Sequence, residues 1–254
     1  LTPQNPQRWH LVDIGSGLGA NVRHTAPTLA GPQRWHLIEH NPTLSAQSLR
    51  ALARWAQRLG WAHHHQAQNT LHIDRPGGPL EITAVQGSFD HLDTLVDLPQ
   101  TDIVTAGAVF DLLTDDQLDH MIAMLKRAAT ALWATLNYTG TAFEPIDPDD
   151  AHFVALYEAH MRRPRPEGAS MGPDCAAQMA QRLRACGFEV TEGPSVWRIP
   201  AAAAAMQDHM RGFFAHAVPE VPGCDPQVFA RWQGRRWPAP TLLVSHSDLL
   251  AIPR

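Results

Sequence analysis

Lysine is nearly absent from this chain of 254 residues, since Lys126 is the only one among 20 basic side chains. The 25 acidic side chains outnumber the basic ones, and the formal net charge is −5. A protein without a broad cationic face is poorly suited to bind nucleic acid. We therefore expect a small-molecule substrate and no nucleic-acid partner, while the composition makes no prediction of oligomeric state.

Cysteine is also scarce, and the three residues, Cys175, Cys186 and Cys224, do not form a C-x-x-C motif. An odd number of scattered cysteines argues against a disulfide framework and favours reduced thiols in the cytoplasm. No apolar run approaches the roughly 20 residues that a membrane helix needs, so we expect no membrane contact. Residues 1–8 contain neither Met nor a signal-like apolar stretch, and we expect the natural start to lie upstream.

Metal-ligand motifs are missing, although 15 histidines invite the hypothesis of a metal site. The triplet His63-His64-His65 follows an expected helix. Three adjacent side chains converge on one ion less readily than ligands spaced along a helix face. We interpret the triplet as a solvated connection and predict no metal site.

The glycine-rich turn after the first apolar run is the most informative feature that is present. Leu11-Val12-Asp13-Ile14 is typical of a buried strand, and it is followed by Gly15, Gly17 and Gly19. Glycine tolerates positive φ and lets the backbone approach a ligand closely. A helix expected from Ala20 aims free N–H groups at the same place. The pattern predicts a cofactor site for a nucleotide-like ligand.

A second strand, Arg34 to Glu39, ends in a carboxylate 24 residues beyond Gly15, and Asn41-Pro42 then opens a helix. In a doubly wound sheet an acid at this place lies beside the first glycine turn and can accept both hydroxyls of a ribose. A solvated glutamate at the strand end is the alternative.

Four segments follow one another along the first half of the chain: Asp13 to Gly19, Leu37 to Glu39, Val85 to Asp90, and Asp102 to Phe110. Their order and spacing resemble the motifs of class I S-adenosylmethionine-dependent methyltransferases. The resemblance implies S-adenosyl-L-methionine as cofactor, with Asp13 near its methionine end and Glu39 on its ribose. It also implies cofactor contacts by Gly15, Ser16, Gly17, Gly19, His40, Ser88, Phe89, Asp90 and Ala106.

The adenine contact departs from the family pattern, because many members have an acid where Ser88 stands. Ser88 and Asp90 are therefore alternative acceptors for the adenine amino group, beside Phe89.

A nicotinamide-dependent oxidoreductase is the rival, since Gly15, Gly17 and Ala20 also satisfy the pattern G-x-G-x-x-G/A. The only tyrosines, Tyr138 and Tyr157, have no lysine four residues on, so the Tyr/Lys pair of short-chain dehydrogenases is missing. We also consider an RNA or protein methyltransferase, which the weak cationic character opposes, and a non-catalytic protein that binds the cofactor.

Strands and helices alternate from residue 9 to about residue 137, as a parallel sheet requires. We predict one α/β domain over residues 1–254, with a Rossmann-like, doubly wound, mostly parallel sheet whose residues 9–137 form the cofactor-binding half. Thr114 to Gln117 is a capping box that starts a helix. The fifth strand is predicted to end at Asn137-Tyr138. Later strands are expected at 188–191, 196–199 and 241–245.

Two segments, 139–172 and 199–237, interrupt this alternation with helical stretches, and the first is rich in proline and charge. They leave and re-enter near the carboxyl end of the sheet, where such folds bind ligands. We therefore expect them to form a lid over the substrate pocket. The run Arg162-Arg163-Pro164-Arg165 is either an anion clamp or a solvated charge run.

Two side chains are the catalytic candidates. Asp111 follows the fourth strand, where the family often places a polar residue facing the transferred methyl group, and a solvated aspartate is the equal alternative. Tyr138 ends the fifth strand over the expected pocket, and a core tyrosine with a bonded hydroxyl is the alternative. No histidine stands at the end of either strand. Because the sulfonium donor is already activated, orientation of the acceptor is expected to supply most of the catalysis.

Overall fold

The computed structural model describes residues 8–166 and 168–254, so the expectation about the first residues of the chain lies outside the described part. Within these ranges the strands form one nine-stranded sheet in the order β3-β4-β5-β2-β1-β6-β7-β9-β8. The strands are β1 (Trp9–Ile14), β2 (Gln33–Glu39), β3 (Ala62–Ala67), β4 (Thr70–Asp74), β5 (Leu80–Gln86), β6 (Ile103–Gly107), β7 (Ala131–Glu144), β8 (Phe188–Pro200) and β9 (Thr241–Pro253).

The central strands β5, β2, β1, β6 and β7 are all parallel. The hairpin β3-β4 adds an antiparallel edge beside β5, and β9 runs antiparallel to both β7 and β8. From β1 the chain winds outward through β2 to β5 and then returns to β6 on the other side of β1, so the switch point lies between β1 and β6. This confirms the predicted Rossmann-like, doubly wound α/β fold.

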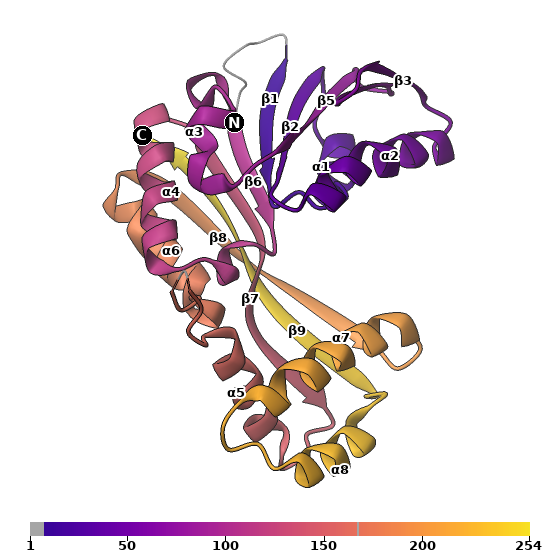
Figure 1. Ribbon diagram of the computed structural model, residues 1–254, viewed down its shortest axis with the longest axis vertical. Helices are drawn as coiled ribbons and strands as arrows, with labels where there is room; N and C mark the ends of the chain where they lie inside the picture. The colour runs from indigo at the N-terminus through magenta and orange to yellow at the C-terminus, as the bar shows by residue number, and fades with distance from the viewer. Residues whose placement is uncertain (1–7, 167) are drawn as a thin grey trace.

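Helices cover both faces of the parallel strands (Figure 1). They are α1 (Ala20–Thr25), α2 (Pro42–Arg58), α3 (Leu92–Leu95), α4 (Asp115–Ala128), α5 (Asp150–Met161), α6 (Cys175–Ala185), α7 (Ala204–Ala217) and α8 (Pro226–Arg236). Helices α1 and α2 share a core with Leu11, Trp35 and Leu37 on one face, while α4 and α6 share the other core with Val12, Ile14 and Val104. Alternate residues of β1 thus face opposite layers, as a buried parallel strand requires.

Both predicted helix starts are confirmed by their caps. Asn41 Oδ1 accepts from the backbone N–H groups of Thr43 and Leu44 at the start of α2. Thr114 and Gln117 form the reciprocal capping box of α4. These bonds satisfy N–H groups that have no partner inside a helix, so short sequence signals fix where the helices of the cofactor-binding half begin.

The predicted ends of the last three strands are wrong. β7 continues past Tyr138 to Glu144 after a register shift between Ala134 and Asn137. β8 is one continuous strand where two were expected, and β9 runs on to Pro253. The reason is long-range: β7 and β8 pair along both sides of β9, and this pairing satisfies backbone groups of segments that lack a strong strand pattern of their own.

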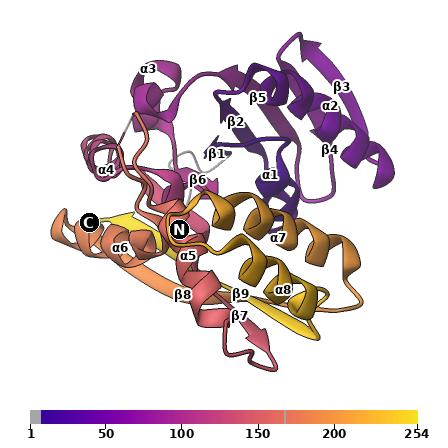
Figure 2. The same cartoon turned by 60° about the horizontal axis from the view of Figure 1, so that its bottom comes forward.

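The extended strands carry α5, α7 and α8, and together these elements form what we call the distal lobe (Figures 1 and 2). It has its own core, whose fully buried aromatic members are Phe143, Phe153, Phe214 and Trp232. The segments 139–172 and 199–237 therefore build a second layer on continuous strands. Their role as a cover of the substrate pocket stays a prediction.

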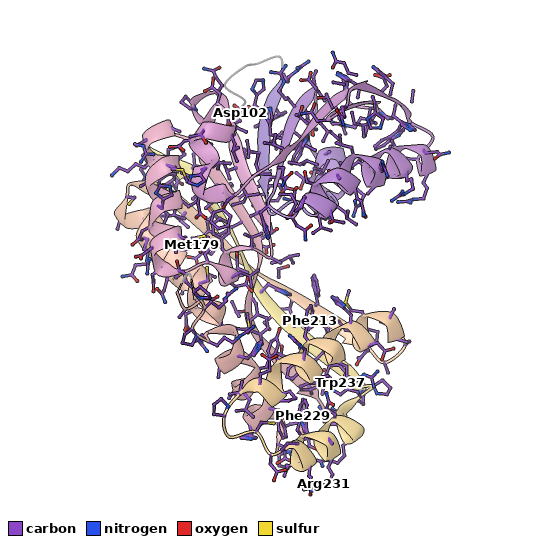
Figure 3. All side chains as sticks on the ribbon, viewed as in Figure 1. Asp102, Met179, Phe213, Phe229, Arg231 and Trp237 are labelled. Carbon is purple, nitrogen blue, oxygen red and sulfur yellow. The ribbon has the colours of Figure 1, made fainter. Side chains whose placement is uncertain are left out.

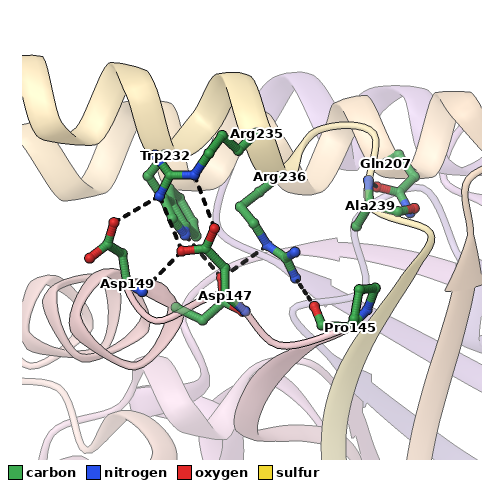
Figure 4. A network of polar contacts seen from close by, with 9 residues as sticks. Pro145, Asp147, Asp149, Gln207, Trp232, Arg235, Arg236 and Ala239 are labelled. Carbon is green, nitrogen blue, oxygen red and sulfur yellow. Dashed lines mark hydrogen bonds and ion pairs between the residues drawn. The ribbon is translucent and has the colours of Figure 1, made fainter.

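Polar contacts fasten α8 to the start of α5 inside this lobe (Figure 4). Asp150 Oδ1 accepts from Trp232 Nε1 at 2.9 Å and lies 3.0 Å from Arg236 Nε. Arg235 binds Asp147 and Asp149 with distances of 2.8 to 3.1 Å. A buried indole N–H paired with a carboxylate avoids the cost of an unsatisfied donor, so these contacts position the helices of the lobe.

The histidine triplet was predicted to lie in a solvated connection, but it lies in the edge strand β3. His63, His64 and His65 are all exposed, and their backbone pairs with β4. Pairing with β4 overrides the weak strand propensity of this polar segment. No group of three or more potential ligands is arranged for a metal ion in the described part of the chain. Within the same part, no helix combines the length and apolar character needed to span a bilayer.

Candidate cofactor site

A cavity of about 440 Å³ opens where β1, β2, β5 and β6 end at the carboxyl edge of the sheet. This volume lies within the range of small-molecule sites, which is roughly 300 to 1,000 Å³. Of the predicted cofactor contacts, the residues that line it are Gly15, Gly17, Glu39, His40, Ser88 and Phe89. The four motif segments therefore meet at one cavity, as expected of a doubly wound sheet.

The glycine turn is shaped by two different constraints. Gly15 has a φ of 60°, and a Cβ there would stand 2.7 Å from Val109 Cγ2, so this position is closed by packing. Gly17 has a φ of 52°, and a Cβ there would meet no atom within 4 Å. Because Gly17 lines the cavity, a side chain at this position would occupy the space that a ligand needs.

Glu39 connects the glycine turn to the start of α2. Its Oε2 accepts from the backbone N–H of Gly17 at 2.9 Å, and its Oε1 accepts from that of Asn41 at 2.9 Å. The side chain is buried at the cavity wall. A carboxylate offers about four lone-pair sites, so Glu39 can accept further hydrogen bonds from a ligand while it holds the turn. His40 lies at the exposed rim, 3.3 Å from Glu39 Oε1.

Asp13 lies buried at the end of β1 with only one of its oxygens engaged. Oδ1 accepts from Asn21 Nδ2 at 2.9 Å, whereas Oδ2 has no partner in the described structure. Burial raises the pKa of Asp13 to about 7, the hydrogen bond from Asn21 lowers it, and the charge of Glu39 raises it further. Ser16 Oγ is likewise buried without a described partner. Unpaired buried polar atoms are costly and call for an explanation, which a polar ligand group would supply.

The two alternative adenine acceptors, Ser88 and Asp90, lie side by side in the structure, and the adenine contact stays a prediction. Ser88 Oγ donates to Asp90 Oδ2 at 2.9 Å, and Asp90 Oδ1 lies 3.4 Å from Gln117 Nε2. Ser88 and Gln117 line the cavity and Asp90 does not. Asp90 thus orients the residues that face the ligand space.

Five predicted contacts do not line the cavity, namely Asp13, Ser16, Gly19, Asp90 and Ala106. Ala106 is fully buried in the core because β6 continues to Gly107, so Ala108 and Val109 lie at the cavity in its place. A Cβ at Gly19 would meet the side chain of Leu52 at 3.0 Å, which places that glycine against α2. Ser16 stays beside the cavity, at the turn.

Eleven lining residues were not among the predicted contacts: Ile38, Leu44, Gly87, Ala108, Val109, Leu112, Leu113, Thr114, Gln117, Arg165 and Gly168. Gly87 directly follows β5, and Ala108 and Val109 directly follow β6, so their place after a strand could have indicated them. Arg165 comes from the segment 139–172, and its Nη2 donates to the carbonyl of Leu112 at 3.1 Å. Arg162 pairs with Asp174 and Arg163 binds His160, so only Arg165 of this run lines the cavity, and the anion clamp stays a prediction.

Neither catalytic candidate lines this cavity. Asp111 lies in the 3-10 segment Phe110–Leu112, where it is buried rather than solvated, and its Oδ1 has no described partner. Burial raises the pKa of Asp111 to about 6. Burial and, after it, the charge of Asp111 raise the pKa values of Tyr157 in α5 and Cys175 in α6.

The prediction that Tyr138 ends its strand is wrong, because β7 continues to Glu144. Its hydroxyl shares a hydrogen bond with Thr141 Oγ1 at 3.0 Å, and burial raises the pKa of that hydroxyl. The ring packs edge to face on Tyr157 in the core of the distal lobe. Tyr138 is thus a core residue at the junction of the two parts.

No family model and no curated protein matches this sequence. The chain is similar to solved structures of methyltransferases. They include precorrin-6y C5,15-methyltransferase from Geobacter metallireducens (13% identity, TM-score 0.44, 98% of this chain and 81% of that one). A methyltransferase from Geobacter sulfurreducens in complex with S-adenosyl-L-homocysteine is similar (12%, 0.43, 100% and 86%). Phosphoethanolamine N-methyltransferase 2 of Haemonchus contortus (10%, 0.42) is matched over 100% of this chain, which spans only 50% of that protein.

Proposed function

We propose that this chain, which has the fold of class I methyltransferases, is an S-adenosylmethionine-dependent methyltransferase that acts on oxygen or nitrogen of a small molecule. The observation that carries the proposal is the pairing of Glu39 with the N–H of Gly17 at the wall of the cavity. One carboxylate thereby fixes the glycine turn and faces the space in which a ribose would lie.

The residues present are suited to this cofactor. Glu39 would accept from the ribose hydroxyls, and Ser88 with Phe89 would contact the adenine. The unpaired Oδ2 of Asp13 and the Oγ of Ser16 offer acceptors for the amino group of the methionine part. S-adenosylmethionine supplies an activated methyl group on a sulfonium sulfur, and the protein's task is to orient the acceptor in line with it.

Two alternative functions can be distinguished from the proposed one. An RNA or protein methyltransferase needs a surface for a large substrate, and the net charge of −5 with a single lysine disfavours RNA. A non-catalytic binding protein would show saturable cofactor binding without methyl transfer to any extracted metabolite.

Calorimetric titration with S-adenosylhomocysteine tests the proposal. Glu39→Ala should weaken binding by about 2 to 3 kcal/mol, the usual scale for hydrogen bonds to a charged group. Glu81→Ala is the matched control. Glu81 is also a glutamate in a strand, but it lies on β5 outside the cavity lining and pairs with Arg8 and Arg34. Unchanged affinity in a folded Glu39→Ala variant would remove Glu39 from the site, and tighter binding of NAD by the parent would overturn the family assignment.

A further inference from the structure

His246 is a buried histidine with one ring nitrogen left available. It lies in β9 with 7% of its surface exposed, and its Nδ1 is 3.0 Å from the carbonyl oxygen of Ser195. A carbonyl oxygen only accepts, so Nδ1 carries the proton in the neutral ring and Nε2 presents its lone pair. Among the described residues, no hydrogen bond is made to Nε2. This is the protonation pattern of a general base.

The strand register places His246 at the carboxyl edge of the parallel sheet. β6 ends at Gly107, which pairs with Thr135 of β7. Three residues further along β7, Tyr138 pairs with His246, which pairs with Ser195 on the other side. The glycine turn leaves β1 at this same edge, where ligands of doubly wound folds bind.

The side chain of His246 points to the same side of the sheet as α1. Leu250 pairs with Trp133, and Trp133 packs on the core that α1 and α2 share. Side chains alternate along a strand, so Leu250, Asp248 and His246 all point to the α1 side. In Figure 1, α7 of the distal lobe lies across from α1 on that side. The imidazole therefore points to the side of the sheet on which α1 and α7 lie.

Partly exposed apolar side chains lie on β8, on α7 and in the glycine turn. The ring of Trp197 on β8 lies 4.8 Å from that of His246, between ring centroids, and 36% of the residue is exposed. Phe213 is 45% exposed, whereas its neighbour Phe214 is fully buried, and Figure 3 shows Phe213 on the side of α7 toward the cofactor-binding half. Leu18 of the glycine turn is exposed as well. Exposed rings near a buried polar group are typical of a site for a planar ligand.

We propose that His246 is a catalytic residue and that the methyl acceptor is an aromatic hydroxyl compound, which rests on Trp197 and Phe213. This inference rests on the proposed function and names the acceptor class of the same site. Nε2 takes the hydroxyl proton while the oxygen forms its bond to the methyl carbon. The carbon–sulfur bond of the sulfonium donor breaks, and its electron pair stays on sulfur. The imidazolium then returns the proton to water.

The surroundings of His246 agree with a neutral base. Burial lowers its pKa, while the bond to Ser195 and the charge of Asp248 raise it. Tyr138 is the titratable group opposite on β7, and β8 presents Ser195 and Trp197. A neutral imidazole at pH 7 can accept a proton without first losing one.

The first test follows binding by NMR on protein with ¹⁵N-labelled histidine, saturated with S-adenosylhomocysteine, as 2-naphthol is added. We expect a protonated Nδ1 and an unprotonated Nε2 at His246, and a saturable shift of the Nε2 resonance. Trp197→Leu should weaken the binding of 2-naphthol at least tenfold. If S-adenosylhomocysteine binds but 2-naphthol does not shift the Nε2 resonance of His246, the acceptor site is refuted while the proposed cofactor site stands. If S-adenosylhomocysteine does not bind, the proposed function itself fails.

The second test measures single-turnover methyl transfer to 2-naphthol. His246→Gln should slow the reaction about 100-fold at pH 7, the lower scale of a lost general base. Raising the pH toward about 10, where a phenol ionises by itself, should recover most of the rate, which a structural defect would not allow. His64→Gln on the exposed edge strand is the control. A parent that binds 2-naphthol but does not methylate it, or an equal rate in His246→Gln, would overturn the assignment. So would loss of the rate in Asp111→Asn with His246→Gln unaffected.

Discussion

Replacing Asp13 by asparagine should stabilise the ligand-free protein and make its stability less sensitive to pH. Burial raises the pKa of Asp13 from 3.8 to about 7 in the folded state. Between these values the folded protein holds a proton that the unfolded chain has released. The free energy of unfolding therefore falls as pH rises from about 4 to 7, and the loss persists above pH 7. Asparagine has no such penalty because it does not ionise.

The magnitude follows from the same pKa. A tenfold change in proton concentration is worth about 1.4 kcal/mol, so ionising Asp13 costs the folded state about 4 kcal/mol above pH 7. The amide Oδ1 can still accept from Asn21, but its NH₂ group has no partner in the described structure, which costs about 1 to 3 kcal/mol at every pH. Taking the difference between two pH values removes that constant cost. From pH 5 to pH 8 the advantage of Asp13→Asn should grow by about 3 kcal/mol.

Urea unfolding at pH 5, 6, 7 and 8 measures this difference for the parent, Asp13→Asn and the control Asp93→Asn. Asp93 is suitable because it is exposed and forms only a surface ion pair with Arg127, so its substitution should show little pH dependence. A constant difference between the parent and Asp13→Asn across this range would refute the reasoning. It would mean that Asp13 is ionised at an ordinary pKa in the free protein and that its unpaired oxygen is solvated.

Two further substitutions test the cavity and the distal lobe. Gly17→Val should abolish the rise in Tm that S-adenosylhomocysteine gives the parent, whereas Gly60→Val, also at positive φ with open space around it, should retain it; equal shifts in both would remove the turn from the site. Trp232→Phe should lower the unfolding free energy by about 1 to 3 kcal/mol in urea, because Asp150 loses the indole N–H. An unchanged midpoint would contradict that role of the bond.

The cofactor-binding half was predictable because its signals are local. Gly17, Glu39, Asn41 and Thr114 each act through contacts within a few residues, or with the neighbouring strand of a sheet whose order follows from the winding of the chain. Reading these signals required no knowledge of distant partners. Six of the 17 residues that line the cavity were therefore predicted from the sequence, and most of the others come from the stretches that follow β6 and α5.

The distal lobe was not predictable in the same way, since its strands depend on partners far along the chain. β8 passes through Gly193 and Pro194, both poor strand residues, and is held there by pairing with Asp248 and Ser247. The last strand was expected to end at Ser245, one residue before His246. The histidine was consequently invisible as a site residue, although it lies level with Tyr138, which the sequence did single out.

The bulge in β7 lies where the cofactor-binding half meets the distal lobe. Leu136 has a φ of 57°, and its N–H donates to Asp248 Oδ1 at 2.8 Å where the strand changes register. Before the bulge β7 is paired with both β6 and β9, and beyond it with β9 alone. β7 and β9 thus belong to both the cofactor-binding half and the distal lobe. Because continuous strands join the two parts, the sheet itself connects the glycine turn to His246.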